Sequence, residues 1–186
     1  MKKEPIKSQQ RRTLTKRLIQ EALLDILKTK SIQMITVREL CDAAGVNRTT
    51  FYNHYNGVYE VLGEIEDNFL EQFDMEDNLP DNEYSLEPHM EKLLNWLMQH
   101  SDIALLLLTN NIDPNFSIKL MQGKPDGVVW KRIVNNYPSN ERDLLVDFVS
   151  GGAYSLVCHW LQNGCKETPK QIASLLAQII HNGVVL

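Results

Sequence analysis

Helical periodicity runs through almost the whole sequence and limits what the chain can fold into. In the first long segment, apolar side chains recur every three or four positions: Leu14, Leu18, Ile19, Ala22, Leu23, Ile26 and Leu27. This spacing places them on one face of an α-helix. No stretch of useful length alternates apolar and polar residues, as a half-buried strand would. The sequence therefore predicts an all-α protein of nine or ten helices.

Glycines, prolines and capping residues divide the chain into these helices. After the first helix, which ends near residue 27, we expect helices over 37–44, 48–54, 57–74, 86–101, 102–111, 114–122, 126–137, 139–163 and 168–183. Thr36 and Glu39 have the spacing of a capping box. Gly45 and Gly164 stand where a helix ends in the left-handed conformation, and Pro169 suits a first turn. The acidic segment 75–85 is the predicted linker.

Charge is distributed unevenly along the 186 residues, whose net charge is −5. Residues 1–57 carry eleven Lys/Arg against five Asp/Glu, whereas residues 60–91 carry twelve acidic residues and no Lys or Arg. A polyanion would be attracted to the first third of the chain and repelled by the remainder. A solvated basic tail would give the same composition, so charge alone leaves both interpretations open.

Several classes of protein are disfavoured by the composition and by absent motifs. The three cysteines suit a reducing compartment, and the longest aliphatic run, residues 103–108, is far short of the ~20 residues of a membrane helix. The first residues lack the apolar stretch of a signal peptide. No phosphate-binding glycine loop, zinc-protease motif or nucleophile elbow occurs. We expect a soluble cytoplasmic protein that is not an enzyme and uses no cofactor.

Cys158, His159 and Cys165 are the residues closest to a metal-binding pattern. The two cysteines are seven residues apart and could share a helix face. His159, however, points about 100° away from Cys158, and Gly164 interrupts the helix between the cysteines. The sequence therefore predicts no metal site.

The stretch CDAAGVNRTTFYNHY, residues 41–55, has the punctuation of a helix-turn-helix motif. In that motif the first residues of the second helix meet base edges in the major groove. Arg48 could read a guanine or hold a phosphate, while Tyr52 and His54 can donate hydrogen bonds to phosphate oxygens. An internal corner between two helices would use the same residue types, and spacing alone leaves both alternatives open.

The longer segment TVRELCDAAGVNRTTFYNHY resembles the DNA-binding segment of the tetracycline-repressor (TetR) family of bacterial transcription regulators. The resemblance covers residues 13–62, and residues 150–179 resemble the terminal helix pair of a low-GC Gram-positive subgroup. It implies an N-terminal three-helix helix-turn-helix domain, residues 1–57, and a larger C-terminal helical domain for dimerisation and effector binding, residues 58–186. We expect the DNA-facing residues to be Thr36, Asn47, Arg48, Thr49, Thr50, Tyr52, Asn53 and His54.

The chain departs from the family pattern at Val58, where members usually carry a lysine that meets a phosphate. Asn56 can cap the helix that follows, and the free amides of its first turn could hold a phosphate without a side chain. Glu60 and Glu64 would repel that phosphate. We therefore expect a modest affinity for DNA, with the basic N-terminal arm partly compensating.

The last two helices carry long apolar stripes and a Gly-Gly-Ala step at 151–153. Paired with a symmetry mate they would form a four-helix bundle, although an intrachain core would show the same stripes. The resemblance favours a homodimer through residues 140–183.

The resemblance also implies an effector pocket, for which the candidate lining residues are Met90, Trp96, Trp130, Tyr154 and His159. Each of them also fits an ordinary core position. The few basic residues in this part favour a neutral or cationic effector over an anionic one. We predict a dimeric regulator that binds a palindromic operator in double-stranded DNA, acts as a repressor, and has no membrane partner. The alternative is a protein-binding co-regulator that keeps the fold without reading an operator.

Overall fold

The computed structural model describes residues 6–76, 86–109 and 137–184, together with residues 116, 120 and 135. Eight α-helices and one short 3₁₀ turn account for nearly all of these residues, and the described part of the chain contains no strand. The prediction of an all-α protein is confirmed. Nearly all of the helices expected at 114–122 and 126–137, and most of the predicted linker, lie outside the described residues.

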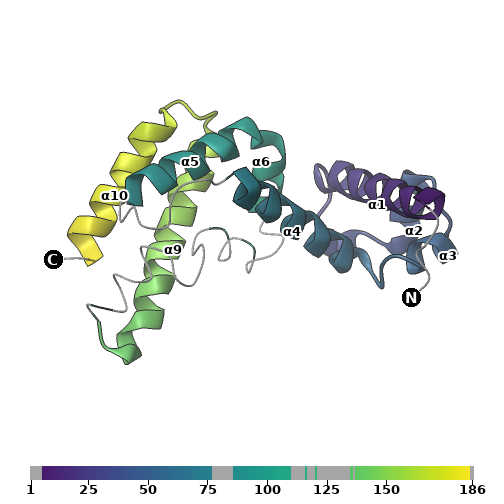
Figure 1. Cartoon of the computed structure of the whole chain (residues 1–186), viewed down its shortest axis with the longest axis horizontal. Helices are drawn as coiled ribbons and strands as arrows, with labels where there is room; N and C mark the ends of the chain where they lie inside the picture. Colours follow the sequence, from purple (N-terminus) through teal and green to yellow (C-terminus); the bar gives the residue numbers. More distant parts are fainter. Residues whose placement is uncertain are drawn as a thin grey trace. The chain divides into compact units, whose positions relative to one another are not determined.

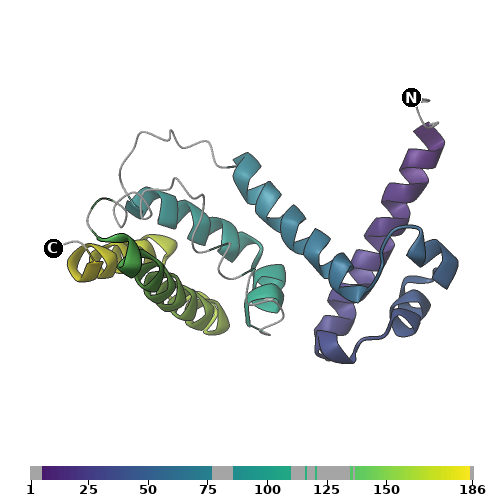
Figure 2. The ribbon, with the colours of Figure 1, turned by 90° about the horizontal axis from the view of Figure 1, so that it is seen from below.

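Contacts between backbone positions divide the chain into two compact units, residues 1–69 and residues 70–186. The first unit contains α1 (Ile6–Leu27), the 3₁₀ turn η1 (Ile32–Met34), α2 (Val37–Ala44), α3 (Arg48–Tyr52) and the first part of α4 (Val58–Glu76). The helices α1 and α2 pack together, and α3 packs on α2 (Figures 1 and 2).

The second unit contains the rest of α4, then α5 (Leu86–Gln99), α6 (Ser101–Thr109), α9 (Ser139–Gln162) and α10 (Pro169–Val184). Two packed pairs form its core: α10 lies along α5, and α9 contacts α6 (Figure 1). Leu94, Leu97, Val157, Trp160 and Leu176 are among the buried side chains of these helices. The division between the units falls inside α4, whereas the functional boundary after residue 57 stays a prediction.

The predicted stop signals between the last two helices are confirmed. Gly164 has φ +76° and ends α9, and Pro169 is the first residue of α10. Thr168 and Gln171 then cap α10 reciprocally, because the Thr168 backbone N–H donates to Gln171 Oε1 at 2.8 Å and the Gln171 N–H donates to Thr168 Oγ1 at 3.3 Å.

Of the helices described, only α9 is long and apolar enough, by length and composition alone, to cross a membrane. Such a helix is weak support for a membrane span, because a helix in the core of a soluble protein passes the same test. Only 33% of its apolar window is buried within the chain, however, and Leu144 and Phe148 are its large exposed apolar residues.

Candidate nucleic-acid interface

The first helix of the motif, α2, begins and ends where its sequence predicts. Thr36 Oγ1 accepts a hydrogen bond from the Glu39 N–H at 3.2 Å. The Glu39 carboxylate accepts from Lys30 Nζ at 2.6 Å, and this hydrogen bond, assisted by another from the Thr36 backbone, lowers the pKa of Glu39. At the other end Gly45 adopts φ +66° and donates to the carbonyl oxygens of Asp42 and Cys41.

The second helix, α3, is shorter than the predicted 48–54. Asn47 caps it as expected, since its Oδ1 accepts from the Thr50 N–H at 2.7 Å. The helix ends at Tyr52 because the next residues tighten into a turn, in which the His54 N–H donates to the Phe51 carbonyl oxygen at 2.9 Å. A hydrogen bond of this 3₁₀ type, from an N–H to the carbonyl oxygen three residues earlier, commonly closes a helix. His54 therefore lies just after α3 and not in it.

Two buried aromatic side chains hold α3 in place. Phe51 is 0% and Tyr55 2% exposed, and their ring centroids are 5.8 Å apart. Tyr52 packs edge-on against Phe51, at 5.5 Å between centroids, yet remains 54% exposed. The motif thus has one face committed to the core of the first unit and an opposite face left in solvent.

The predicted DNA-facing residues lie mainly on the solvent face. Six of them are exposed: Thr36, Asn47, Arg48, Thr49, Tyr52 and Asn53. The other two, Thr50 and His54, are half-buried. Thr36 and Asn47 use an oxygen for capping, which leaves the Thr36 hydroxyl hydrogen and the Asn47 amide hydrogens to donate elsewhere. Their DNA contacts remain predictions.

Arg48 differs from the neighbouring basic residues. Lys30 pairs with Glu39, and Arg38 lies 3.9 Å from Asp42. Among the residues that the structure describes, no carboxylate forms an ion pair with Arg48. A guanidinium at the start of an exposed helix, with its charge uncompensated, is suited to binding a phosphate or a guanine edge.

The surroundings of His54 lower the pKa of its imidazole. Burial lowers its pKa most, and the positive charges of Arg12 and Lys16 lower it further, against a smaller opposing effect of Glu64. Its Nδ1 is buried and accepts or donates no hydrogen bond within the described structure. Because an orphaned buried N–H is rarer than an orphaned acceptor, we place the proton on Nε2, where it can be donated to a phosphate.

A polar network absent from the sequence prediction joins α1 to the start of α4. Lys16 Nζ lies 2.8 Å from Glu64 Oε1 and 5.2 Å from the centre of the Tyr55 ring. The Tyr55 hydroxyl accepts from Gln20 Nε2 at 3.2 Å and is hydrogen-bonded to Glu64. Burial and this contact with Glu64 raise the pKa of Tyr55 well above its usual range. The network fixes the end of the motif on α1.

The start of α4 differs from the expectation in two respects. Val58 is 7% exposed, so its side chain belongs to the core. The hydrogen bonds of Asn56 are donated, since its backbone N–H and Nδ2 lie 2.6 Å and 2.9 Å from Glu60 Oε2. The Glu60 carboxylate, which was expected to repel a phosphate, therefore accepts two hydrogen bonds from Asn56 at the start of this helix.

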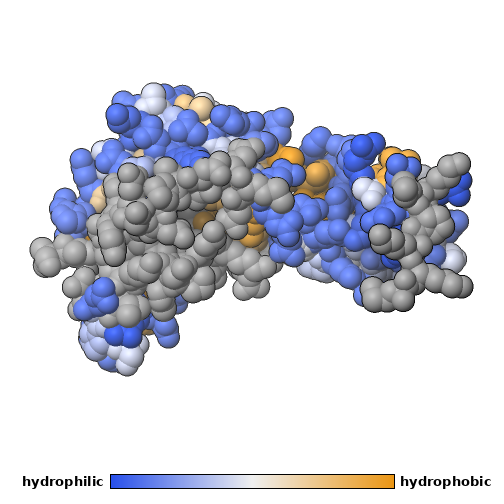
Figure 3. Space-filling model, viewed as in Figure 1, coloured by the Kyte–Doolittle hydropathy of each residue, from blue (hydrophilic) through white to orange (hydrophobic). Residues whose placement is uncertain are grey.

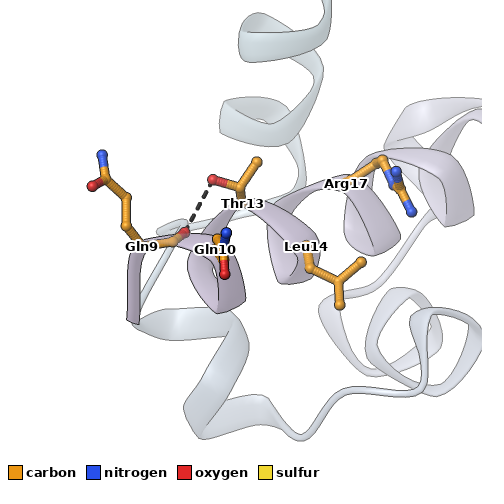
Figure 4. A pocket seen from close by; sticks show the side chains of 5 residues that line it. All are labelled: Gln9, Gln10, Thr13, Leu14 and Arg17. Carbon is orange, nitrogen blue, oxygen red and sulfur yellow. Dashed lines mark hydrogen bonds between the residues drawn. The ribbon is translucent and has the colours of Figure 1, made fainter. Parts of the chain in front are cut away.

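The first half of α1 carries a shallow hollow of about 350 Å³, lined by Gln9, Gln10, Thr13, Leu14 and Arg17. Figure 4 shows these side chains, and the Thr13 hydroxyl donating to the Gln9 carbonyl oxygen at 3.1 Å. All the lining residues come from one helix, so the hollow is a surface depression. The surrounding surface of this unit is mostly hydrophilic on the face shown in Figure 3.

The candidate effector residues lie in different environments. Trp96 is buried, with its ring centroid 5.4 Å from Phe73 and 4.7 Å from His100. The Tyr154 hydroxyl donates to the Leu108 carbonyl oxygen, and burial raises the pKa of Tyr154 to about 12.

Of the remaining three, Met90 is half-buried, His159 is exposed, and Trp130 lies outside the described residues. The groove that His159 lines, between α9 and α10, includes no other effector candidate. The described residues contain no group of three His, Cys, Asp or Glu side chains that could hold a metal ion.

The two capped helices and the turn between them form a helix-turn-helix motif with Arg48 at the start of its second helix. The family described as "Transcriptional regulator C-terminal region" matches residues 84–182, more than half of the chain. The chain belongs to this TetR-type family of transcriptional regulators, which confirms the resemblance seen in its N-terminal third.

Relatives and solved structures agree with this assignment. An uncharacterized HTH-type transcriptional regulator YxbF from Bacillus subtilis is 21% identical over 174 residues. The match covers 87% of this chain, which spans 43% of the length of that relative.

Two solved structures share the fold. A TetR transcriptional regulator from Streptococcus agalactiae has a TM-score of 0.70 at 23% identity, covering 93% of this chain and 97% of that one. The fatty acid degradation regulator FadR from Bacillus halodurans has a TM-score of 0.60 at 17% identity, covering 100% and 99%.

Proposed function

We propose that the protein is a cytoplasmic homodimeric repressor that binds a palindromic operator in double-stranded DNA through α3. The observation that carries this proposal is Arg48, which has no carboxylate partner among the described residues and begins the helix that Asn47 caps. Asn47, Thr49 and Tyr52 are exposed beside it and supply further hydrogen-bond donors. Arg48 reads a base or holds a phosphate. Tyr52 and His54 donate hydrogen bonds to DNA phosphates, and these contacts position the protein on the duplex.

Dimerisation through residues 140–183 is supported by the exposed apolar side chains of the last two helices. Leu144 and Phe148 on α9 are 70% and 74% exposed, and Leu175 and Ile179 on α10 are 45% and 53% exposed. Apolar residues in such number seldom remain in water. In a two-fold dimer the recognition helices lie about 34–36 Å apart, or a multiple of one DNA turn.

The effector part of the proposal rests on family membership. We propose a small neutral or cationic molecule bound within the second unit, near Met90, Trp96, Trp130 and Tyr154, that releases the repressor. His159 faces solvent in the single chain and is the weakest of the candidates. A change in intrinsic tryptophan fluorescence that saturates as a ligand is added, accompanied by loss of operator binding, would support the effector part of the proposal.

A binding selection from genomic DNA fragments tests the proposal, followed by affinity measurements on the selected site at several salt concentrations. Arg48→Ala should weaken specific binding by about 1–3 kcal/mol per half-site. Its matched control is Arg38→Ala, since Arg38 is also exposed on the motif but is near Asp42. Selection of no fragment, with the protein folded and dimeric, would overturn operator binding and favour a protein-binding co-regulator.

A further inference from the structure

The exposed face of α9 has an unusual composition at its centre. Leu144, Phe148, Gly151, Gly152 and Leu156 recur at helical spacing on this face, opposite the buried Ala153 and Val157 face. Two adjacent glycines inside a helix each cost about 1 kcal/mol relative to alanine. An added Cβ at either glycine would meet nothing within 4 Å, and neither has a positive φ. The fold of the single chain therefore gives no reason for glycine at these positions.

A groove opens at the C-terminal end of the same face. It has a volume of about 430 Å³ and lies between the end of α9 and the start of α10. Leu156, Trp160, Ile172 and Leu175 form its apolar part, and His159, Asn163, Lys166 and Glu167 form its polar part. The Trp160 indole N–H donates to the Glu167 carbonyl oxygen at 2.9 Å. This hydrogen bond fixes the Trp160 ring, which lines the groove, against the segment before α10.

The exposed large apolar side chains of this face, Leu144 and Phe148, lie at its other end. Phe148 comes three to four residues before the glycine pair, and Leu156 comes four to five residues after it. A two-fold axis perpendicular to α9 and passing near Gly151–Gly152 would place Phe148 of one chain opposite Leu156 of another. Both contacts would form at once, because an isologous interface uses each pair twice.

We propose that a second copy of the chain docks on this face with the two-fold axis at Gly151–Gly152, so that Phe148 of each protomer fills the groove of the other. The glycines let the two α9 helices approach closely at the axis, and each groove is completed by an aromatic ring that its own chain cannot supply. This inference rests on the proposed dimer and specifies its register.

A disulfide trap tests the register directly. Phe148→Cys and Leu156→Cys on one chain are eight residues apart on a helix, about 12 Å, which is too far for an intrachain bond. The double variant should give a covalent dimer on a non-reducing gel after mild oxidation. The two single variants and the wild type, which retains its three native cysteines, should give monomer bands under the same conditions.

Sedimentation equilibrium supplies the second measurement. Phe148→Ala removes two rings from the dimer and should raise its dissociation constant roughly a hundredfold, at about tenfold for each ring. Ile103→Ala is the control, because Ile103 is also an exposed apolar residue (36%) but lies on α6. Gly152→Leu should weaken the dimer while raising the thermal stability of the monomer, since it removes a helical glycine.

The outcomes separate this inference from the proposed function. A wild-type dimer that tolerates Phe148→Ala and does not cross-link through the double variant would overturn the register and leave dimerisation intact. A wild-type monomer at micromolar concentration would overturn both. A monomer that floats with phosphatidylcholine vesicles would identify lipid as the occupant of this face and would likewise overturn the inference.

Discussion

Tyr52 and Tyr55 lie three residues apart, and removing the hydroxyl from each should have opposite consequences. Tyr55 is 2% exposed, and its hydroxyl is hydrogen-bonded to Gln20 and Glu64. Tyr52 is 54% exposed and lies on the proposed DNA-binding face. We expect Tyr55→Phe to reduce stability without changing the affinity of the folded protein for DNA, and Tyr52→Phe to do the reverse.

The size of the stability effect follows from the contacts of Tyr55. The bond from Gln20 is long, at 3.2 Å, and is worth about 0.5 kcal/mol. A hydrogen bond to a charged group contributes about 1.5–3 kcal/mol, but the Glu64 side chain is 32% exposed, so water replaces part of this bond. We therefore expect Tyr55→Phe to lower the free energy of unfolding by about 1–2 kcal/mol. In a chain of this length the melting temperature should fall by about 2–8 °C.

The affinity effect of Tyr52→Phe comes from one phosphate contact in each protomer. The hydrogen bond from Tyr52 to a phosphate is charge-assisted but exposed to solvent, so its loss in both half-sites should cost about 1–3 kcal/mol, which is roughly a 5- to 150-fold increase in the dissociation constant. The loss should be similar for specific and non-specific DNA, because phosphate contacts carry no sequence information.

Circular-dichroism melts and fluorescence anisotropy on labelled DNA measure the two quantities on the same preparations. Equal melting temperatures for wild type and Tyr55→Phe would show that the network between α1 and α4 contributes nothing. Unchanged affinity in Tyr52→Phe would show that the exposed ring does not reach the phosphate backbone.

Three further predictions concern single groups. The Lys16 ammonium holds the pKa of Glu64 below its usual value although burial opposes this. Glu64 should therefore stabilise the fold above about pH 4.5, and this contribution should be lost as the pH falls through the lower folded pKa. In Glu64→Gln the melting temperature should depend less on pH between pH 7 and 3. NMR titration should give His54 a pKa below 6.5 in the free protein, because burial and nearby cations lower it, and operator DNA should raise that pKa. Gly45→Ala should cost about 1–2 kcal/mol because φ is +66°, whereas the control Gly57→Ala, without a positive φ, should not.

Sequence alone predicted the elements whose signals are local. Thr36, Gly45 and Asn47 determine the ends of α2 and the start of α3 through hydrogen bonds to residues within four positions, and each predicted cap is present. The early end of α3 was not predicted, because the turn at Asn53 and His54 depends on where Phe51 and Tyr55 are buried.

The sequence pattern could not predict contacts between residues that lie far apart in the chain. The ion pair between Lys16 and Glu64 joins residues 48 positions apart, and an i, i+4 analysis of either helix cannot find it. The same limit applies to Val58: the sequence showed that it replaces the lysine usual at this place in the family, but only the packing of α4 shows that this side chain is buried.

The stripes of α9 show why periodicity is insufficient to locate a partner. Val157 and Phe148 are both apolar residues on the same helix, yet one is 1% and the other 74% exposed. Their helical positions differ by 180°, so α9 is apolar on two faces. One face is covered by its own chain. The other face is the one on which we propose that a second copy docks, with the closest approach at Gly151 and Gly152.

In the helix-turn-helix unit, the residues that stabilise the fold differ from those that we propose contact DNA. Phe51 and Tyr55 are buried, while Arg48, Thr49 and Tyr52 alternate with them on the solvent side. Substitution of a buried aromatic residue by alanine typically costs about 3–5 kcal/mol, whereas exposed positions usually change stability by less than about 0.5 kcal/mol. The exposed side of α3 can therefore vary without loss of the fold. A change of operator preference requires no compensating change in the core, which is the property expected of a helix whose exposed side contacts DNA.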